Sequence, residues 1–223
     1  MSRPIKEIEK NIGYRFSNHR LLDQAMAHSS CQNIKDNTFD RLEYLGDAVL
    51  ELIISEFLFR TCPHYTEGEL TKVRTGVVSE NSLFMAAKRI GIHENILLGK
   101  GEENSAGREK PSILSDALEA LIGALYLDSD LKTVTSVVLK LLKSNIENAI
   151  DIGGTQDYKT KLQEELQSRS SDSIHYDTTQ MPDEKSLFHA IVYHGVRMLG
   201  KGSGRRKKLA EQAAAQDALK KLR

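Results

Sequence analysis

The sequence has little cysteine and no long apolar run. Its two cysteines, Cys31 and Cys62, do not form a CxxC pair, and the beginning of the chain does not combine basic residues with an apolar run long enough to direct secretion. No stretch reaches the roughly 20 apolar residues that span a bilayer, because two glutamates interrupt the longest run, AVLELIISEFLF at residues 48–59. These absences predict a cytoplasmic protein in a reducing compartment, with no membrane partner.

The formal net charge is zero, but the two halves of the chain differ in sign. Up to Gly153 the sequence has 18 lysines and arginines against 22 aspartates and glutamates, and after Gly153 it has 13 against 9. An acidic half joined to a basic half suggests two functions, with the basic half a candidate for binding a polyanion. An excess of this size also arises by chance.

No internal repeat or low-complexity tract is present, and the first 150 residues have the apolar periodicity of successive helices. The expected helices are 19–28, 40–60, 69–78, 80–91, 112–128 and 131–150. Pro63, Gly91 and the polar loop 99–111 separate some of them. The pattern predicts an all-α N-terminal domain over residues 1–150.

The pattern changes after a short polar linker at residues 151–156. Helical periodicity is expected at 157–167 and 207–222, and β-branched and aromatic residues favour strands at 174–180, 186–194 and 196–202. The order α-β-β-β-α predicts a small α+β C-terminal domain over residues 157–223.

Acidic residues recur at helical spacing inside two apolar segments. Asp40, Glu43 and Asp47 in DRLEYLGDAVLEL stand at i, i+3 and i+7, and Asp116 and Glu119 stand at i and i+3. Helices this apolar should be buried on most sides, and several buried carboxylates require cations or protons. A set of oxygen ligands favours Mg²⁺ or Mn²⁺ over zinc.

A simpler alternative is that each acid lies on the solvated stripe of an amphipathic helix, or that Arg41 pairs with one of them. Two glycines favour the metal site. Gly46 beside Asp47 and Gly123 one turn after Glu119 are each costly in a helix interior, by about 1 kcal/mol, which suggests close approach of another backbone or a ligand.

Several motifs together resemble those of bacterial ribonuclease III. They are LLDQAMAHSS, DRLEYLGDAVL, EGELTKVRTGVVSENSL and SDALEALIGALYLD, and the similarity continues in order from about Ile8 to Leu222. The resemblance implies a homodimeric endoribonuclease that cleaves double-stranded RNA by Mg²⁺-dependent hydrolysis, with Mn²⁺ able to substitute. It also implies 5′-phosphate and 3′-hydroxyl products and a role in the maturation or decay of rRNA and mRNA.

The resemblance assigns roles to single positions. Glu43, Asp47, Asp116 and Glu119 match the metal-binding carboxylates, and among them Asp47 and Glu119 match the catalytic ones.

Three further positions of the catalytic domain match the family. Asp40, where the family usually has Glu, and Glu67 match acids on the RNA side. Tyr44 matches an aromatic residue of the dimer interface. Glu67 is alternatively a surface acid, and Tyr44 a core aromatic. His28 is interpreted as a structural hydrogen-bonding residue at a helix end.

Four cations precede or open the last expected helix: Arg205, Arg206, Lys207 and Lys208. A helix N-terminus already presents positive charge, so four cations there favour an anion such as an RNA phosphate. The alternative is a solvated basic loop.

The C-terminal region resembles a double-stranded-RNA-binding domain, with an RNA-binding first helix and a basic second one. The residues that match the minor-groove face of the first helix are Thr160, Gln163, Glu164 and Gln167. Met181, Glu184 and Arg206 depart from the family's usual Gly, His and Ser.

Three classes of function fit the sequence to different degrees. An RNA-cleaving enzyme uses all the acids. A protein that binds duplex RNA without cutting it has no need of a complete metal site. A helical metal phosphohydrolase acting on nucleotides usually needs histidine ligands, and the seven histidines here are scattered.

Overall fold

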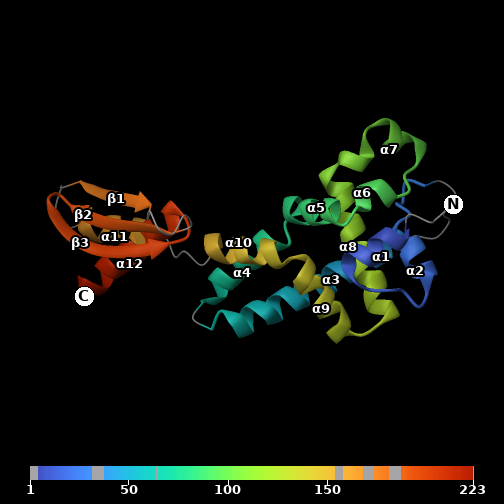
Figure 1. Ribbon diagram of the computed structural model, residues 1–223, viewed down its shortest axis with the longest axis horizontal. Helices are drawn as coiled ribbons and strands as arrows, with labels where there is room; N and C mark the ends of the chain where they lie inside the picture. The colour runs from blue at the N-terminus through green and yellow to red at the C-terminus, as the bar shows by residue number, and fades with distance from the viewer. Residues whose placement is uncertain are drawn as a thin grey trace. The chain divides into compact units, whose positions relative to one another are not determined.

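The computed structural model describes residues 5–31, 38–63, 65–153, 158–167, 173–180 and 187–222. The chain divides into two compact units, Met1–Ile150 and Asp151–Arg223 (Figure 1). Each unit has its own hydrophobic core. The fold class predicted from the sequence, a helical domain followed by an α-β-β-β-α domain, is confirmed.

The described part of the first unit consists of helices. They are α1 (Ile5–Ile12), α2 (His19–Ala25), α3 (Thr38–Thr61), α4 (Glu67–Val77), α5 (Glu80–Arg89), α6 (Ile92–Asn95), α7 (Lys100–Asn104), the 3₁₀ turn η1 (Gly107–Glu109), α8 (Pro111–Asp128), α9 (Leu131–Leu141) and α10 (Lys143–Gly153).

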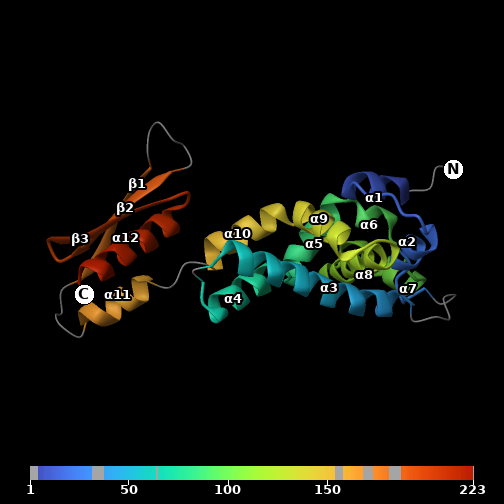
Figure 2. The same cartoon turned by 90° about the horizontal axis from the view of Figure 1, so that it is seen from below.

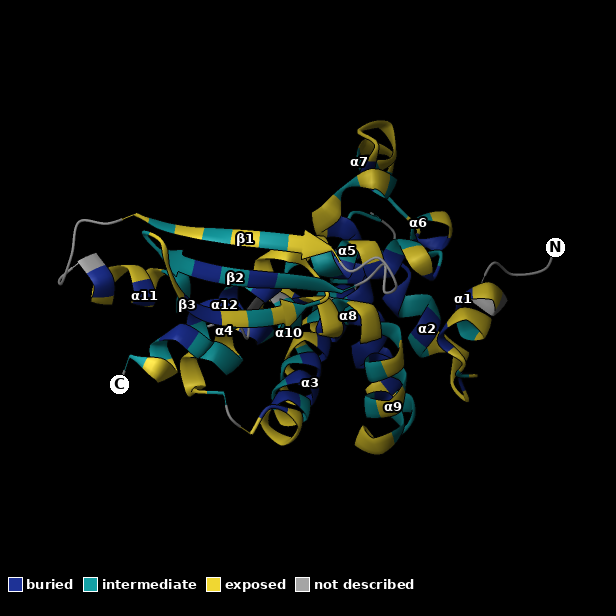
Figure 3. Ribbon diagram, turned by 60° about the vertical axis from the view of Figure 1, so that its left-hand side comes forward, coloured by how far each residue is buried: buried dark blue, intermediate teal, exposed yellow. Residues whose placement is uncertain are grey.

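Helices α3 and α8 pack against each other in the middle of this unit. Leu50, Ile54 and Leu58 form a buried row along α3 at four-residue spacing, and Leu114 and Leu118 do the same on α8. Burying each such side chain contributes about 1.5–3 kcal/mol, which fixes the two helices together. Figure 3 shows buried and exposed residues alternating along the helices, as amphipathic packing requires.

Several helical details differ from the expectation. Helix α1 was not expected, although Ile8 and Ile12 are one turn apart and both buried. The segment expected as one helix over 131–150 is interrupted at Leu142, where Arg89 of α5 donates a hydrogen bond to the carbonyl of Leu141 at 3.2 Å. This tertiary hydrogen bond stabilises the interruption, and no local sequence signal announces it.

Helix α10 extends further than expected. It continues to Gly153, three residues into the segment predicted as a linker. The consecutive glycines at 153 and 154 are the first residues there that disfavour a helix. Part of the loop expected at 99–111 is also helical, as α7 and η1.

The second unit contains α11 (Tyr158–Gln167), β1 (Ile174–Gln180), β2 (Phe188–His194), β3 (Arg197–Gly204) and α12 (Lys207–Lys221). The strands form an antiparallel sheet in the order β1-β2-β3, with Tyr176 opposite Val192. Both helices lie on one side of this sheet (Figure 2). A Cβ at Gly202 would overlap the backbone of α12, so this glycine allows the helix to pack directly on β3.

Within the described residues, no helix is both long enough and apolar enough to cross a membrane.

Candidate active site

Two glycines bring the acidic helices together. A Cβ at Gly46 of α3 would overlap the carbonyl oxygen of Glu119 in α8 and would lie 2.9 Å from the amide nitrogen of Gly123. A Cβ at Gly123 would in turn overlap the carbonyl oxygen of Leu42. The close approach inferred from the glycines is therefore confirmed, and the approaching group is backbone. No larger residue fits at this crossing without moving one helix.

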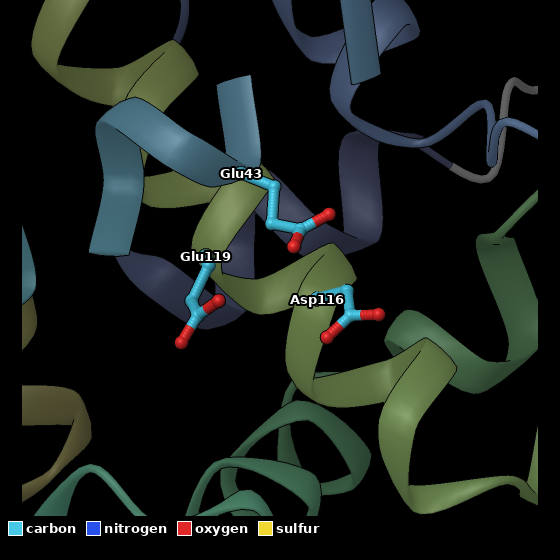
Figure 4. A group of neighbouring side chains, drawn as sticks. All are labelled: Glu43, Asp116 and Glu119. Atoms are coloured by element: carbon cyan, nitrogen blue, oxygen red, sulfur yellow. The ribbon is translucent and has the colours of Figure 1, made fainter. Parts of the chain in front are cut away.

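The crossing places Glu43 of α3 beside Asp116 and Glu119 of α8. Each contributes a carboxylate oxygen to a group in which these atoms lie within 4.8 Å of one another. Figure 4 shows the three side chains coming from the two helices into a shared space. All three are partly buried. We refer to Glu43, Asp116 and Glu119 as the carboxylate cluster.

Burial and mutual repulsion oppose ionisation of the carboxylate cluster. Burial raises the pKa of Glu119 from the ordinary 4.5 to about 8, and the charges of Asp47 and Asp116 add to this shift. Burial is also the largest cause of the raised pKa of Glu43 and of Asp116. Within the described part of the chain, no lysine or arginine forms an ion pair with the cluster. The cluster is thus suited to a bound cation.

The raised pKa of Glu119 predicts an unusual pH dependence of stability. A carboxyl group with a higher pKa in the folded state stabilises the fold below its unfolded pKa, and this contribution disappears as pH rises through the folded value. We therefore expect the free energy of unfolding, measured by urea denaturation in EDTA, to fall between about pH 4.5 and 8. Glu119→Gln should flatten this fall, and an unchanged pH profile in that variant would contradict the assignment.

The other predicted acids lie outside the cluster. Asp47 is exposed and Asp40 is partly buried. Burial and then the charge of Asp116 are the largest causes of the raised pKa of Glu43, and the charges of Asp40 and Asp47 make smaller contributions. The structure thus brings together three of the four predicted metal-binding acids, with Asp47 one turn further along α3. Glu67 lies exposed in the first turn of α4, where its carboxylate accepts a hydrogen bond from Thr71 Oγ1 at 3.0 Å.

Tyr44 is 80% exposed, so it is not a core residue of its own subunit. Leu52 and Phe59 of α3 are also exposed, at 52% and 74%. The three residues recur at intervals of about two helical turns and form an apolar stripe along α3. We refer to Tyr44, Leu52 and Phe59 as the α3 stripe.

A pocket of about 680 Å³ lies between α3 and α4. Leu52 and Phe59 of the α3 stripe line it, together with Leu70, Arg74 and Glu67 of α4. The pocket depends on the angle between two helices, which the periodicity of either helix does not predict. The sequence shows that residues 52 and 59 are large and apolar, but not that they are exposed.

His28 is a hydrogen-bonding residue just after α2, as expected from the sequence. Its Nδ1 lies 2.8 Å from Ser30 Oγ, and the Ser30 backbone N–H donates to the same nitrogen at 3.2 Å. Ser30 Oγ also accepts a hydrogen bond from the Gly99 N–H at 2.9 Å. These bonds join the segment after α2 to the segment before α7.

The predicted RNA-binding residues of the second unit that the structure describes are exposed. Thr160, Gln163 and Glu164 lie on α11. The four cations Arg205, Arg206, Lys207 and Lys208 are exposed where α12 begins. The side chain of Gln167 and the residues Met181 and Glu184 lie outside the described part of the chain.

Two family models match the chain. One, described as Ribonuclease-III-like, matches residues 18–146, and the other, described as Double-stranded RNA binding motif, matches residues 158–222.

Curated proteins and solved structures are also similar to this chain. Ribonuclease 3 of Clostridium beijerinckii is 46% identical over 219 residues, which cover 96% of this chain and 94% of that protein. Ribonuclease 3 of Listeria innocua is 43% identical over 228 residues, covering 97% of each. A solved structure of the nuclease domain of ribonuclease III from Campylobacter jejuni superposes on this chain with a TM-score of 0.61 at 40% identity. It is described as showing structural flexibility in a region involved in dimer formation. It covers 63% of this chain and 97% of that domain.

Proposed function

Because the chain belongs to the ribonuclease III family of double-stranded-RNA endoribonucleases, we propose that its carboxylate cluster holds the Mg²⁺ used to hydrolyse the RNA backbone. The observation that carries this proposal is the convergence of Glu43, Asp116 and Glu119 at a glycine crossing. Three partly buried carboxylates with raised pKa values need a cation in order to be ionised together. Oxygen ligands suit Mg²⁺, and Mn²⁺ substitutes for it.

The side chains of the site have different proposed roles in the reaction. Glu43, Asp116 and Glu119 would hold the cation, and exposed Asp47 is placed to join them from the next turn of α3. A bound divalent cation lowers the pKa of water and stabilises charge on the phosphoryl and leaving oxygens. Asp47 and Glu119 are the proposed catalytic residues. Asp40 and Glu67 are proposed to face the RNA.

Attack of water on the phosphorus with the 3′ oxygen as the leaving group leaves 5′-phosphate and 3′-hydroxyl ends. Cleavage through the ribose 2′-hydroxyl would instead need paired acid and base groups, commonly histidines. The hydrogen bonds of His28 go to Ser30 rather than to another histidine.

The experiment that tests this proposal is cleavage of a long RNA duplex by the full chain in Mg²⁺ and in EDTA, with single-stranded RNA as the control. We expect Mg²⁺-dependent fragments from the duplex alone, each of which accepts a 3′-ligated adaptor without phosphatase treatment. Binding without cleavage would support the alternative of an RNA-binding protein. Fragments with 2′,3′-cyclic phosphates would contradict the hydrolytic mechanism.

The second unit is proposed to bind the duplex through two surfaces. Thr160, Gln163, Glu164 and Gln167 would face the minor groove, and the four cations at the start of α12 would contact phosphates. In this division residues 1–150 form the catalytic domain, 151–156 the linker and 157–223 the RNA-binding domain. The free thiols of Cys31 and Cys62 support a reducing cytoplasm, where rRNA and mRNA are processed.

The double substitution Lys207→Ala/Lys208→Ala should weaken binding equally for duplexes of different sequence. Phosphate contacts release counterions, so the slope of log K against log salt should become shallower by about one unit per lost contact. The matched control is Lys220→Ala/Lys221→Ala, which removes the same charge from the other end of α12. A gel-shift salt titration distinguishes them, and equal slopes in the two variants would mean that net charge, not position, matters.

Dimerisation is proposed to bury the α3 stripe. In a twofold dimer the same surface of each subunit meets its copy, so a protruding Tyr44 and the pocket lined by Leu52 and Phe59 could each meet a complement.

Tyr44→Asp should therefore give a monomer in sedimentation velocity, because an unpaired charge would be buried in the interface. The control is Val196→Asp, at a fully exposed apolar residue of the second unit. A Tyr44→Asp protein that remains dimeric would place the interface elsewhere.

A further inference from the structure

Helix α3 carries a column of acids that continues past the carboxylate cluster. Glu43, Asp47 and Glu51 stand at i, i+4 and i+8, so they share one face of the helix. Burial is the main cause of the raised pKa of Glu119, and the negative charge of Glu51 is among the smaller causes. Glu51 is therefore close enough to act on the cluster, although its carboxylate is not part of it.

Glu51 has a basic partner on a different helix. Arg74 Nη1 of α4 lies 3.3 Å from Glu51 Oε2 and donates a hydrogen bond to Ser55 Oγ at 3.0 Å. Ser55 stands one turn after Glu51 on α3. By contrast, another acid of α3, Glu56, forms an ion pair with Arg60, which stands one turn after it on the same helix. Since the residue at i+4 from Glu51 is a serine, α3 itself supplies no such cation, and α4 supplies it.

The pair is only partly shielded by its own subunit. The side chains of Arg74 and Glu51 are 34% and 39% exposed, and ion pairs this exposed contribute little to stability. The hydrogen bond to Ser55 fixes the guanidinium group, and Arg74 also lines the pocket between α3 and α4. The arrangement therefore controls where the Glu51 carboxylate lies more than how stable the fold is.

We propose that Arg74 is a positioning residue that holds the Glu51 carboxylate away from the carboxylate cluster, so that the catalytic cation is bound by the cluster and Asp47 without Glu51. This inference rests on the proposed metal-dependent function. Without Arg74, the Glu51 carboxylate would be free to turn along the acidic face and draw the cation one or two turns down α3. A displaced cation would still bind tightly but would serve the reaction poorly.

Three variants of the full chain test the proposal: Arg74→Gln, Glu51→Gln and the double variant. Mn²⁺ binding without RNA is measured by the loss of the free-ion electron paramagnetic resonance signal, and single-turnover cleavage is measured at saturating Mg²⁺. Arg74→Gln should bind Mn²⁺ about fivefold more tightly, since a nearby positive charge is lost. It should cleave about tenfold more slowly, as is typical when a residue supporting a metal site is removed.

The double variant should recover cleavage to within about twofold of wild type, because no carboxylate remains to be misplaced. Equal impairment of Arg74→Gln and the double variant would overturn the proposal and leave Arg74 as a clamp between α3 and α4. Melting temperature and sedimentation show whether each variant is folded and dimeric.

Glu51→Gln alone keeps the test decisive if Arg74→Gln fails to fold. It should retain cleavage within about twofold, and a loss of about tenfold or more would make Glu51 itself a ligand and overturn the proposal. A wild-type chain without Mg²⁺-dependent cleavage would instead refute the proposed function, so the two failures are distinguishable.

Discussion

Glu119→Gln should reduce single-turnover cleavage by about 10³-fold while leaving duplex binding unchanged. Glutamine keeps the size and hydrogen-bonding capacity of glutamate but loses the charge that is proposed to hold a cation. Activation of the nucleophile and stabilisation of charge on the phosphoryl oxygens and on the leaving group all depend on that cation. Losing the cation therefore removes all three contributions at once. Duplex binding should persist because we propose that the second unit provides most of it.

The fold should also persist in this variant. Burial raises the pKa of Glu119 to about 8, so ionised Glu119 is unfavourable without a cation, and its neutral replacement should raise the melting temperature at pH 8 in EDTA. The matched control is Glu147→Gln, the same change at an exposed position of α10. Near-wild-type cleavage by folded Glu119→Gln, measured beside a gel-shift on the same duplex, would remove Glu119 from the mechanism.

Gly46→Ala should have the second-largest effect, although it adds only one methyl group. That group would overlap the carbonyl oxygen of Glu119, a backbone atom that cannot move unless the whole of α8 moves. Overpacking of this kind costs about 1–3 kcal/mol of unfolding free energy, far more than the helix propensity of alanine restores. Separating α3 from α8 also separates Glu43 from Asp116 and Glu119.

Misplacement of catalytic groups by about 1 Å lowers rates about 10²-fold, so we expect a loss of that order in the protein that remains folded. Gly68→Ala is the control, because a Cβ at Gly68 of α4 would meet nothing within 4 Å. Its stability should change by no more than about 1 kcal/mol. Urea denaturation and single-turnover cleavage of both variants test the difference. Equal behaviour of the two alanine variants would mean that the crossing does not set the site.

The sequence predicted the architecture well where apolar periodicity was strong. The segments of α3 and α8 were expected from rows such as Leu50, Ile54 and Leu58, and the order of the C-terminal strands from their β-branched residues. Periodicity failed for α1, which has only two turns, and at Leu142, where a side chain from α5 donates a hydrogen bond to the preceding carbonyl. Such tertiary contacts leave no local signal.

The candidate site was predictable in composition but not in geometry. Spacing placed Glu43 and Asp47 on one helix face and Asp116 and Glu119 on another, and the two glycines announced a close crossing. Spacing did not reveal that Asp47 would lie outside the group of three. Which acids of α3 join this group depends on the rotation of α3 about its axis, and the packing of its apolar face against α8 determines that rotation.

The pairing of Arg74 with Glu51 was likewise not predicted. The two residues are 23 positions apart in sequence and meet because α4 turns back along α3. Helical spacing relates residues within one helix and contains no information about such a return.

Fe²⁺-directed cleavage of the protein backbone tests most directly whether the carboxylate cluster holds the catalytic cation. Fe²⁺ in place of Mg²⁺, with ascorbate and peroxide, generates radicals that cut the polypeptide beside the bound ion. We predict cuts near Glu43 and near Asp116–Glu119, suppressed by excess Mg²⁺ and absent in Glu119→Gln. Cuts confined to other segments, or cuts at the cluster that excess Mg²⁺ does not suppress, would contradict this account of the site.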